Sequence, residues 1–266
     1  MNNKVLLILV DGMRPDAVMQ CDGGAMRDFF QAGTYSMTAQ TVFPPITLPV
    51  HISLFHSVDP SRHQTMDNIY IKQNHPVESL LDRIGASKKT SATFYSWFPL
   101  RDICTPNADL TYSYFINQHS VKYSIDAFCS MERRLTAAAM RTIHEDAPDF
   151  VFLYLGGTDE FGHQRGWMSK EYFRELQNAW SCIQSITADL PEEYHVIVTA
   201  DHGGHDRCHG ENIPADMTIP MTFHGNHFRE KCEVDGLNIK DIAVTVTDLL
   251  GIAPGDEWEG VSRVNA

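Results

Sequence analysis

Short runs of apolar residues dominate the hydrophobic pattern of this 266-residue chain. The strongest runs occupy residues 5–10, 150–155 and 195–199, and weaker ones occupy 90–95 and 220–223. They are continuous rather than alternating, which indicates strands covered on both faces, as in a parallel sheet. Helical periodicity marks residues 124–144, 170–188 and 239–250 between and after them. The alternation predicts an α/β fold with a mainly parallel central sheet and helices on both faces.

The organisation of the chain is simple. No internal repeat, low-complexity segment or Pro/Ser/Gly-rich linker divides it. We therefore expect residues 1–266 to form a single domain. Residues 98–123 are irregular and rich in aromatic side chains, so we expect a small cap or loop insertion there.

Composition narrows the classes of partner. The formal net charge is −13, whereas nucleic-acid binding needs a basic face. No apolar run reaches 18 residues and no polybasic stretch occurs, so no membrane association is expected. Six cysteines without a Cys-x-x-Cys pair, in a chain without a signal-peptide pattern, favour reduced thiols and a cytoplasmic location. No coiled-coil heptads stand out, and the sequence predicts no oligomeric state.

Acidic residues follow three of the predicted strands. Asp11 ends the first run, Asp159 follows the second with His163 four residues later, and Asp201-His202 follows the third. Each alone is typical of a helix cap or a turn. The carboxyl ends of parallel strands meet at one edge of a sheet, so these side chains should converge. Clustered carboxylates and imidazoles favour a divalent cation, because bare carboxylates would repel one another.

Thr47 adds a hydroxyl to this set. It follows a proline-rich approach and precedes a helix-like segment at residues 50–56. A hydroxyl in that position is most often a helix cap. It can also act as a nucleophile beside backbone N–H groups that hold an anion. The segment alone favours the cap.

Taken together, these segments resemble the alkaline phosphatase superfamily, most closely its nucleotide pyrophosphatase/phosphodiesterase branch. The likeness runs from Val5 to about Val261. The branch's Thr-Phe-Pro-Asn-His motif is present as Thr-Leu-Pro-Val-His, starting at Thr47. Asn68 lies twenty-one residues after Thr47, where the branch has an asparagine that holds a phosphoryl oxygen. The resemblance implies an alkaline-phosphatase-like catalytic domain.

The resemblance also implies two sets of metal ligands. One divalent ion would be bound by Asp11, Thr47, Asp201 and His202, and the other by Asp159, His163 and His209. Mixed carboxylate and imidazole ligands suit zinc, with manganese as an alternative. His205 and His224 compete with His209 for the last position, and the likeness favours His209.

The implied function is a two-metal phosphohydrolase, most closely a phosphodiesterase or nucleotide pyrophosphatase. Thr47 would be the nucleophile, Asn68 would steady the phosphoryl group, and the substrate would be a small phosphate ester or nucleotide. A phosphomonoesterase or a phosphonate (phosphonoacetate-type) hydrolase on the same scaffold is one alternative, and Arg14, Arg165 or Arg207 could then supply an extra cationic group. A non-catalytic metal- or phosphate-binding module is the other. Aromatic side chains that could sandwich a base are Phe43, Tyr70, Tyr95, Trp97, Phe98, Phe161 and Trp167.

Overall fold

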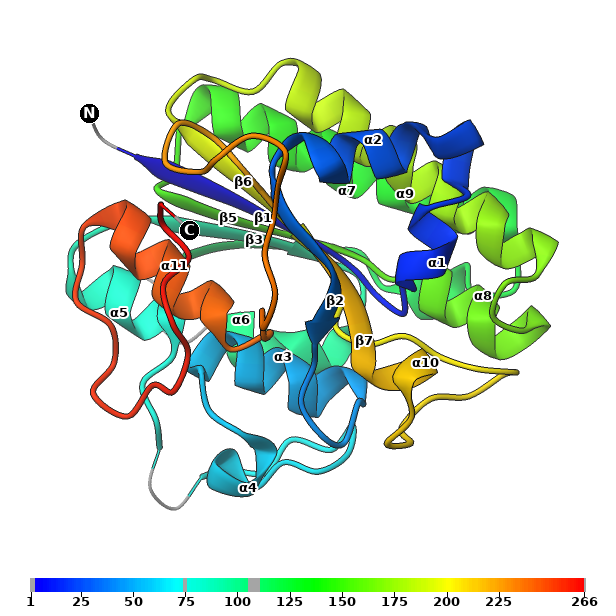
Figure 1. Ribbon diagram of the computed structural model, residues 1–266, viewed down its shortest axis with the longest axis horizontal. Coiled ribbons are helices and arrows are strands. Elements are labelled where there is room, and N and C mark those ends of the chain that lie inside the picture. Colours follow the sequence, from blue (N-terminus) through cyan, green and yellow to red (C-terminus); the bar gives the residue numbers. More distant parts are fainter. Residues whose placement is uncertain (1–2, 74–75, 105–110, 266) are drawn as a thin grey trace.

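The computed structural model describes residues 3–73, 76–104 and 111–265, and within these ranges it contains one eight-stranded sheet. The strands lie in the order β4-β3-β5-β1-β6-β7-β2-β8 (Figure 1). Their bounds are β1 Lys4–Val10, β2 Thr34–Gln40, β3 Ser91–Tyr95, β4 Thr111–Phe115, β5 Phe150–Leu155, β6 Tyr194–Thr199, β7 Thr218–His224 and β8 Cys232–Glu233.

Five neighbouring strands, from β4 to β6, run parallel. β7 is antiparallel to both of its neighbours, β6 and β2. Leu9 in β1 pairs with Tyr154 in β5 and with Thr199 in β6, so the carboxyl ends of these three strands lie at one edge. All six residues of β5 and of β6 are buried, as the continuous apolar runs predict.

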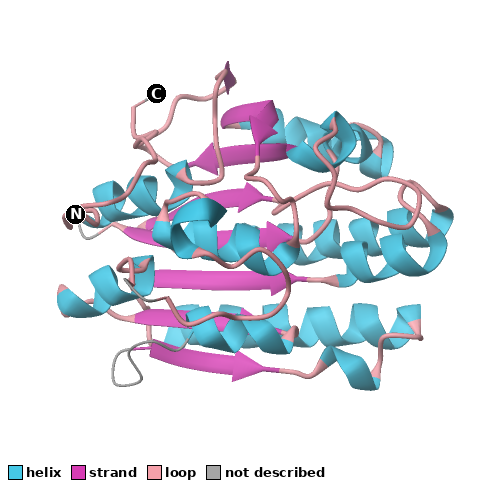
Figure 2. Cartoon of the chain, turned by 90° about the horizontal axis from the view of Figure 1, so that it is seen from below, coloured by secondary structure: helices cyan, strands magenta, loops and turns pink. Residues whose placement is uncertain are grey.

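Helices cover both faces of the sheet (Figures 1 and 2). One face carries α2 (Ala25–Ala32), α7 (Ile125–Glu145) and α9 (Lys170–Ala188), and the other carries α3 (Thr47–His56), α5 (Leu80–Ala86) and α11 (Asp241–Leu250). The predicted α/β fold with a mainly parallel sheet is therefore confirmed. No helix within the described ranges combines the length and apolar character that a bilayer span requires. Shorter helices are α1 Pro15–Val18, η1 Cys21–Gly24, α4 Pro60–His63, η2 Phe98–Leu100, α6 Arg101–Cys104, η3 Gln118–Ser120, α8 Gly157–Arg165 and α10 Pro214–Met217.

The segment at 98–123, predicted to be irregular, contains regular structure. β4 pairs in parallel with β3 and extends the sheet by one strand, and η2 and α6 precede it. Residues 105–110 of this segment lie outside the described residues. The single-domain organisation with a cap stays a prediction.

Candidate metal centre

The carboxyl ends of β1 and β6 bring two aspartates together in the protein interior. Asp11 follows β1 directly and is 1% exposed, and Asp201 follows β6 by two residues and is fully buried. The backbone N–H of Gly12 donates to Asp201 Oδ1 over 3.1 Å, and that of His202 donates over 3.0 Å. Gly12 has a φ of +70°, and a Cβ there would lie 3.1 Å from the Asp159 Cα. Glycine at position 12 therefore lets the backbone of Asp159 approach closely.

His202 faces both of these carboxylates. Its Nε2 lies 3.4 Å from Asp11 Oδ1 and 3.3 Å from Asp201 Oδ2. The hydroxyl of Thr47 lies 3.2 Å from the same nitrogen. Asp11, Asp201 and His202 thus present one ligand atom each, all within 4.8 Å of one another. We call these three residues the inner group.

A second group forms around Asp159, in the first turn of α8. Asp159 Oδ1 lies 3.4 Å from His163 Nε2 and 3.6 Å from His209 Nε2. His163 is one turn further along α8, and His209 lies on the loop after β6. We call Asp159, His163 and His209 the outer group. The ring of His209 stacks on that of His202 at 3.8 Å, and the Nε2 of His202 also lies within ligand range of Asp159 and His209. His202 therefore joins the two groups.

The three imidazoles are oriented in the same way. Each Nδ1 donates to a backbone carbonyl: that of His202 to Gly203, that of His163 to Arg207 and that of His209 to Pro45, over 2.8 to 2.9 Å. A carbonyl only accepts, so each Nδ1 carries the proton and each Nε2 has a free lone pair. Backbone orientation of this kind is typical of metal-ligating histidines.

The carboxylate oxygens opposite these nitrogens make no hydrogen bond. Asp11 Oδ1, Asp159 Oδ1 and Asp201 Oδ2 are buried side-chain oxygens that make no hydrogen bond in the structure. A buried unpaired carboxylate oxygen is costly. A ligand nitrogen and oxygen around one zinc ion lie about 3.3 Å apart, given bonds of about 2.0–2.2 Å, and the observed separations fit that spacing. The residues present thus fit bound divalent cations.

Burial and mutual repulsion shift the protonation of the inner group. The pKa of Asp11 is raised well above its ordinary value by burial and then by the charges of Asp201 and Asp159. Burial, followed by the charge of Asp159, raises the pKa of Asp201 to about 7. The pKa of His202 is lowered well below its ordinary value by burial and by His209. A cation would reverse the cost of carrying these carboxylates in ionised form.

Thr47 is the first residue of α3, so the helix begins three residues before the predicted segment at 50–56. Pro49 falls in the first turn, where its missing N–H costs no intrahelical hydrogen bond. Asn68 is held next to Thr47, because its Oδ1 accepts from the backbone N–H of Leu48 over 3.0 Å. That bond uses the side-chain oxygen and leaves the amide nitrogen of Asn68 as a donor.

The geometry can now be compared with known proteins. The family model described as "Type I phosphodiesterase / nucleotide pyrophosphatase" matches residues 5–248, which is most of the chain. The chain belongs to this family. It lies in the nucleotide pyrophosphatase/phosphodiesterase branch of the alkaline phosphatase superfamily.

Individual relatives of this family member are distant. Human bis(5'-adenosyl)-triphosphatase ENPP4 is 24% identical over 246 residues, 83% of this chain and 52% of the relative. A 2,3-bisphosphoglycerate-independent phosphoglycerate mutase from Clostridioides difficile is 25% identical over 138 residues, 49% of this chain and 27% of the relative. Mouse ectonucleotide pyrophosphatase/phosphodiesterase 5, in complex with AMP, has the same fold with a TM-score of 0.76 at 15% identity, covering 95% of this chain and 96% of that one. The chain thus spans about a quarter to a half of the curated relatives' length.

Two residues of the centre were missed by sequence reasoning. The hydroxyl of Tyr154, in β5, donates to Asp11 Oδ2 over 2.5 Å. A tyrosine inside an apolar strand needs a partner for its hydroxyl, which is the signal that could have identified it. Glu132, in α7, accepts the N–H of Gly157 over 2.8 Å at the start of α8. The N-cap residue of α8, Gly156, has no side chain that could accept a backbone N–H of the first turn. Glu132 therefore caps the helix that carries the outer group.

The two alternative histidines have partners other than Asp159, and the three arginines differ in their contacts and exposure. His205 Nδ1 faces Asp216 at 2.8 Å, and His224 stacks on Phe29 at a centroid distance of 4.4 Å, so of the three candidates it is His209 that faces Asp159. Arg14 donates to the Gly204 carbonyl and to both carboxylate oxygens of Asp16, which engages three of its five guanidinium N–H groups. Arg165 and Arg207 are exposed, and their role as an extra cationic group stays a prediction.

Three of the expected aromatic residues are wrong as base-stacking candidates. Phe161 is 2% exposed and packs on Phe128, and Tyr95 is 4% exposed in the core. Trp167 is buried as well. Its Nε1 donates to the Gly12 carbonyl over 3.0 Å. Its ring packs edge-to-face with that of His163, with the ring centroids 5.1 Å apart. Trp167 supports the metal donors rather than a base. Phe43, Trp97 and Phe98 stay predictions.

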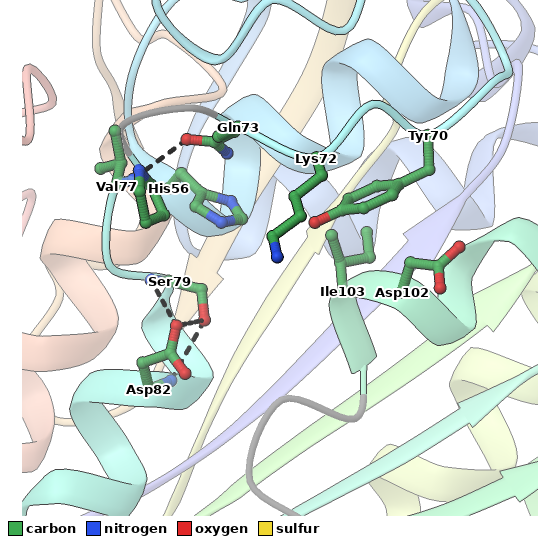
Figure 3. Close-up of a pocket in the computed structure, with 10 residues that line it drawn as sticks. His56, Tyr70, Lys72, Gln73, Val77, Ser79, Asp82, Asp102 and Ile103 are labelled. Atoms are coloured by element: carbon green, nitrogen blue, oxygen red, sulfur yellow. Dashed lines mark hydrogen bonds between the residues drawn. The ribbon is translucent and has the colours of Figure 1, made fainter.

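A separate pocket of about 190 Å³ lies at the other end of α3 (Figure 3). It is lined by His56, the last residue of α3, whereas Thr47 is the first, so about 13 Å of helix separates them. Tyr70 and Lys72 point into this pocket (Figure 3). Tyr70 thus lines a cavity distinct from the carboxylate cluster.

Proposed function

We propose that this chain is a two-metal phosphodiesterase that uses Thr47 as its nucleophile. The observation that carries the proposal is the set of three unpaired carboxylate oxygens, each opposite a lone pair of His202, His163 or His209, beside the Thr47 hydroxyl. The inner group with Thr47 would hold one divalent ion, and the outer group would hold the other. Zinc suits these donors, and manganese is the alternative.

The bound ions would supply positive charge that neutralises the carboxylates and attracts an anionic phosphate to a protein of net charge −13. Thr47 Oγ1 would attack phosphorus, and the bond from phosphorus to the leaving alcohol oxygen would break. The products are a free alcohol, which takes up the proton lost by Thr47, and a threonine whose oxygen is esterified to the phosphate that still carries the second ester group. Water then attacks the same phosphorus, releasing the monoester and restoring the hydroxyl of Thr47.

Two donors near Thr47 fit the non-bridging oxygens of the substrate. The amide nitrogen of Asn68 is free to donate, because the side-chain oxygen is bonded to Leu48. The backbone N–H of Thr47 is the other donor, because the N–H groups of Leu48 and Val50 are bonded to Asn68 and Ile46 and Pro49 has none. Donors aimed at the phosphoryl oxygens would stabilise the charge that develops during transfer.

A nucleotide is the substrate class that the relatives favour. The similarity to a bis(5'-adenosyl)-triphosphatase and to a fold neighbour solved with AMP supports it. The alternative of a phosphomonoesterase would need a further cation for the third phosphoryl oxygen, and Arg14 is engaged with Asp16 and Gly204.

The test compares hydrolysis of bis-p-nitrophenyl phosphate with that of p-nitrophenyl phosphate, on one purified sample, before and after chelation. The proposal predicts faster turnover of the diester and loss of activity with chelator, restored by zinc or manganese. Preference for the monoester would favour the phosphomonoesterase alternative. Metal binding without turnover of either ester would favour a non-catalytic module.

A further inference from the structure

The loop after β6 also brings together side chains of the types that bind metals, outside the inner and outer groups. His205 and Cys208 flank a two-residue turn and exchange both backbone hydrogen bonds, each 2.9 Å long. This pairing projects their side chains to the same side, three residues apart. Cysteine and histidine are the usual ligands of structural zinc, and a separation of three residues on a tight turn is also that of the Cys-x-x-Cys pairs of zinc sites.

The side chains are already close together. Cys208 Sγ lies 3.4 Å and Glu211 Oε1 lies 3.6 Å from His205 Nε2. Bonds of about 2.0–2.3 Å to a tetrahedral zinc would place neighbouring ligand atoms about 3.3–3.6 Å apart. The ligand atoms of His205, Cys208 and Glu211 do not all lie within 4.8 Å of one another, so Glu211, whose side chain is 65% exposed, would move toward Cys208 when an ion binds.

A buried carboxylate fixes the orientation of His205. Asp216 is fully buried, and its Oδ1 lies 2.8 Å from His205 Nδ1. Its other oxygen accepts the N–H of Glu211 over 2.9 Å. A carboxylate on Nδ1 leaves Nε2 as the ligand atom, which is the arrangement that commonly supports a metal-bound histidine.

The charge and access of the loop suit a cation. Asp206, Glu211 and Asp216 surround the pair, with Arg207 as the nearby positive residue. Cys208 is exposed and the side chain of His205 is 23% exposed, so an ion can reach them from solvent. A sulfur donor selects zinc or another soft cation over magnesium or calcium.

We propose that His205, Cys208 and Glu211 form a third metal site, which takes a thiophilic divalent cation such as zinc, with Asp216 as its orienting carboxylate. Solvent completes the coordination. The site is distinct from the inner and outer groups, whose ligands are oxygen and nitrogen only. It is joined to them through the backbone, because His209 directly follows Cys208.

Cadmium titration of the metal-free chain tests this site, because a cadmium–thiolate bond gives an ultraviolet charge-transfer band that carboxylate and imidazole ligands do not. We expect a band that saturates in the wild type, disappears in Cys208→Ser and remains in the matched control Cys232→Ser. Asp216→Asn should weaken binding about 10- to 100-fold. Absence of the band in the wild type, or its survival in Cys208→Ser, would overturn the proposal.

A second measurement needs no variant. Zinc should slow alkylation of Cys208 in the wild-type chain, as mapped by mass spectrometry, and a chelator should restore the rate. Cys21, Cys129 and Cys182 are buried and provide internal references. An alkylation rate at Cys208 that does not change with zinc would count against the site, whatever the outcome for diester hydrolysis.

Discussion

The inner and outer groups differ in the burial of their side chains and in the elements that hold them. Asp11, Asp201 and His202 have side chains that are 0–1% exposed, and strand ends and backbone N–H groups hold them. Asp159 and His163 sit on a short helix, with side chains 17% and 42% exposed. The outer group is therefore more open to solvent than the inner one. We therefore expect the loss of a bound cation to destabilise the inner group more than the outer one.

The elements that position the two groups also differ: central strands hold the inner group, and a helix holds two residues of the outer group. β1 and β6 are central strands whose register is fixed by continuous pairing. The position of α8 depends on Glu132, a buried carboxylate that reaches its first turn from α7. A Cβ on Gly157 would lie 2.6 Å from Glu175 Oε2 and 3.1 Å from Glu132 Oε1. Glycine at 157 is thus what lets α8 dock on this carboxyl pair.

The largest effect is expected from Thr47→Ala, which removes the proposed nucleophile beside the inner group. We expect kcat to fall by at least about 10,000-fold, as for the loss of other enzyme nucleophiles, while metal content stays near that of the wild type. Steady-state kinetics on the diester and metal analysis of the same sample measure both. Thr41→Ala, six residues earlier and also buried, is the matched control. Substantial residual turnover in Thr47→Ala would exclude a covalent role.

Substituting one ligand in each group should lower metal affinity by different amounts. Asp201→Asn should lower affinity for one ion by more than about 100-fold, because nothing replaces a buried carboxylate. His163→Gln should lower affinity for the other ion by about 10-fold, because water can take the place of an exposed ligand. Competition with a chromophoric chelator gives both constants. Equal losses in the two variants would contradict the distinction between the groups.

Glu132→Gln should weaken the support of the outer group alone. The substitution turns one buried acceptor into a donor facing Gly157 or Asn178, at a cost of about 1–3 kcal/mol in free energy of unfolding. We expect weaker binding of the outer ion with the inner ion unaffected. Denaturant unfolding and the chelator assay measure the two effects. Glu145→Gln, exposed on the same helix, should change neither.

The last prediction concerns the pH dependence of stability rather than the metal groups. Burial, and then the charge of Glu132, raise the pKa of Glu175 to about 9. The unfolded chain releases this proton near pH 4.5, but the native chain keeps it, so stability is lost as pH rises from about 5 to about 9. Glu175→Gln should flatten that part of the melting-temperature profile, and Glu171→Gln, exposed on the same helix, should not. A profile in Glu175→Gln as steep as in the wild type would contradict this origin.

The sequence predicts the central strands and the acidic strand ends well, for a physical reason. A strand buried on both faces needs a continuous apolar run, and the residue that leaves it toward the ligand edge stands out as polar, as Asp11 and Asp201 do. β2 and β4 escaped notice because they lie toward the sheet edges. There one face meets solvent and the apolar signal alternates.

Contacts that depend on tertiary packing could not be predicted from the hydrophobic pattern of the sequence. Glu132 and Gly157 are 25 residues apart and meet only because α7 packs beside α8. Phe161 and Trp167 look like any other aromatic residues near a motif, and burial decides that they face the core and the ligand rings. The donor positions thus follow from strand order, whereas their supports follow from tertiary packing.

Anomalous scattering from crystals grown with zinc tests the central claim most directly. The account predicts two maxima in the centre. One should lie about 2.0–2.2 Å from ligand atoms of Asp11 and Asp201, and the other at that distance from Asp159, His163 and His209. A single maximum between the two groups, or none at either, would contradict a two-metal centre.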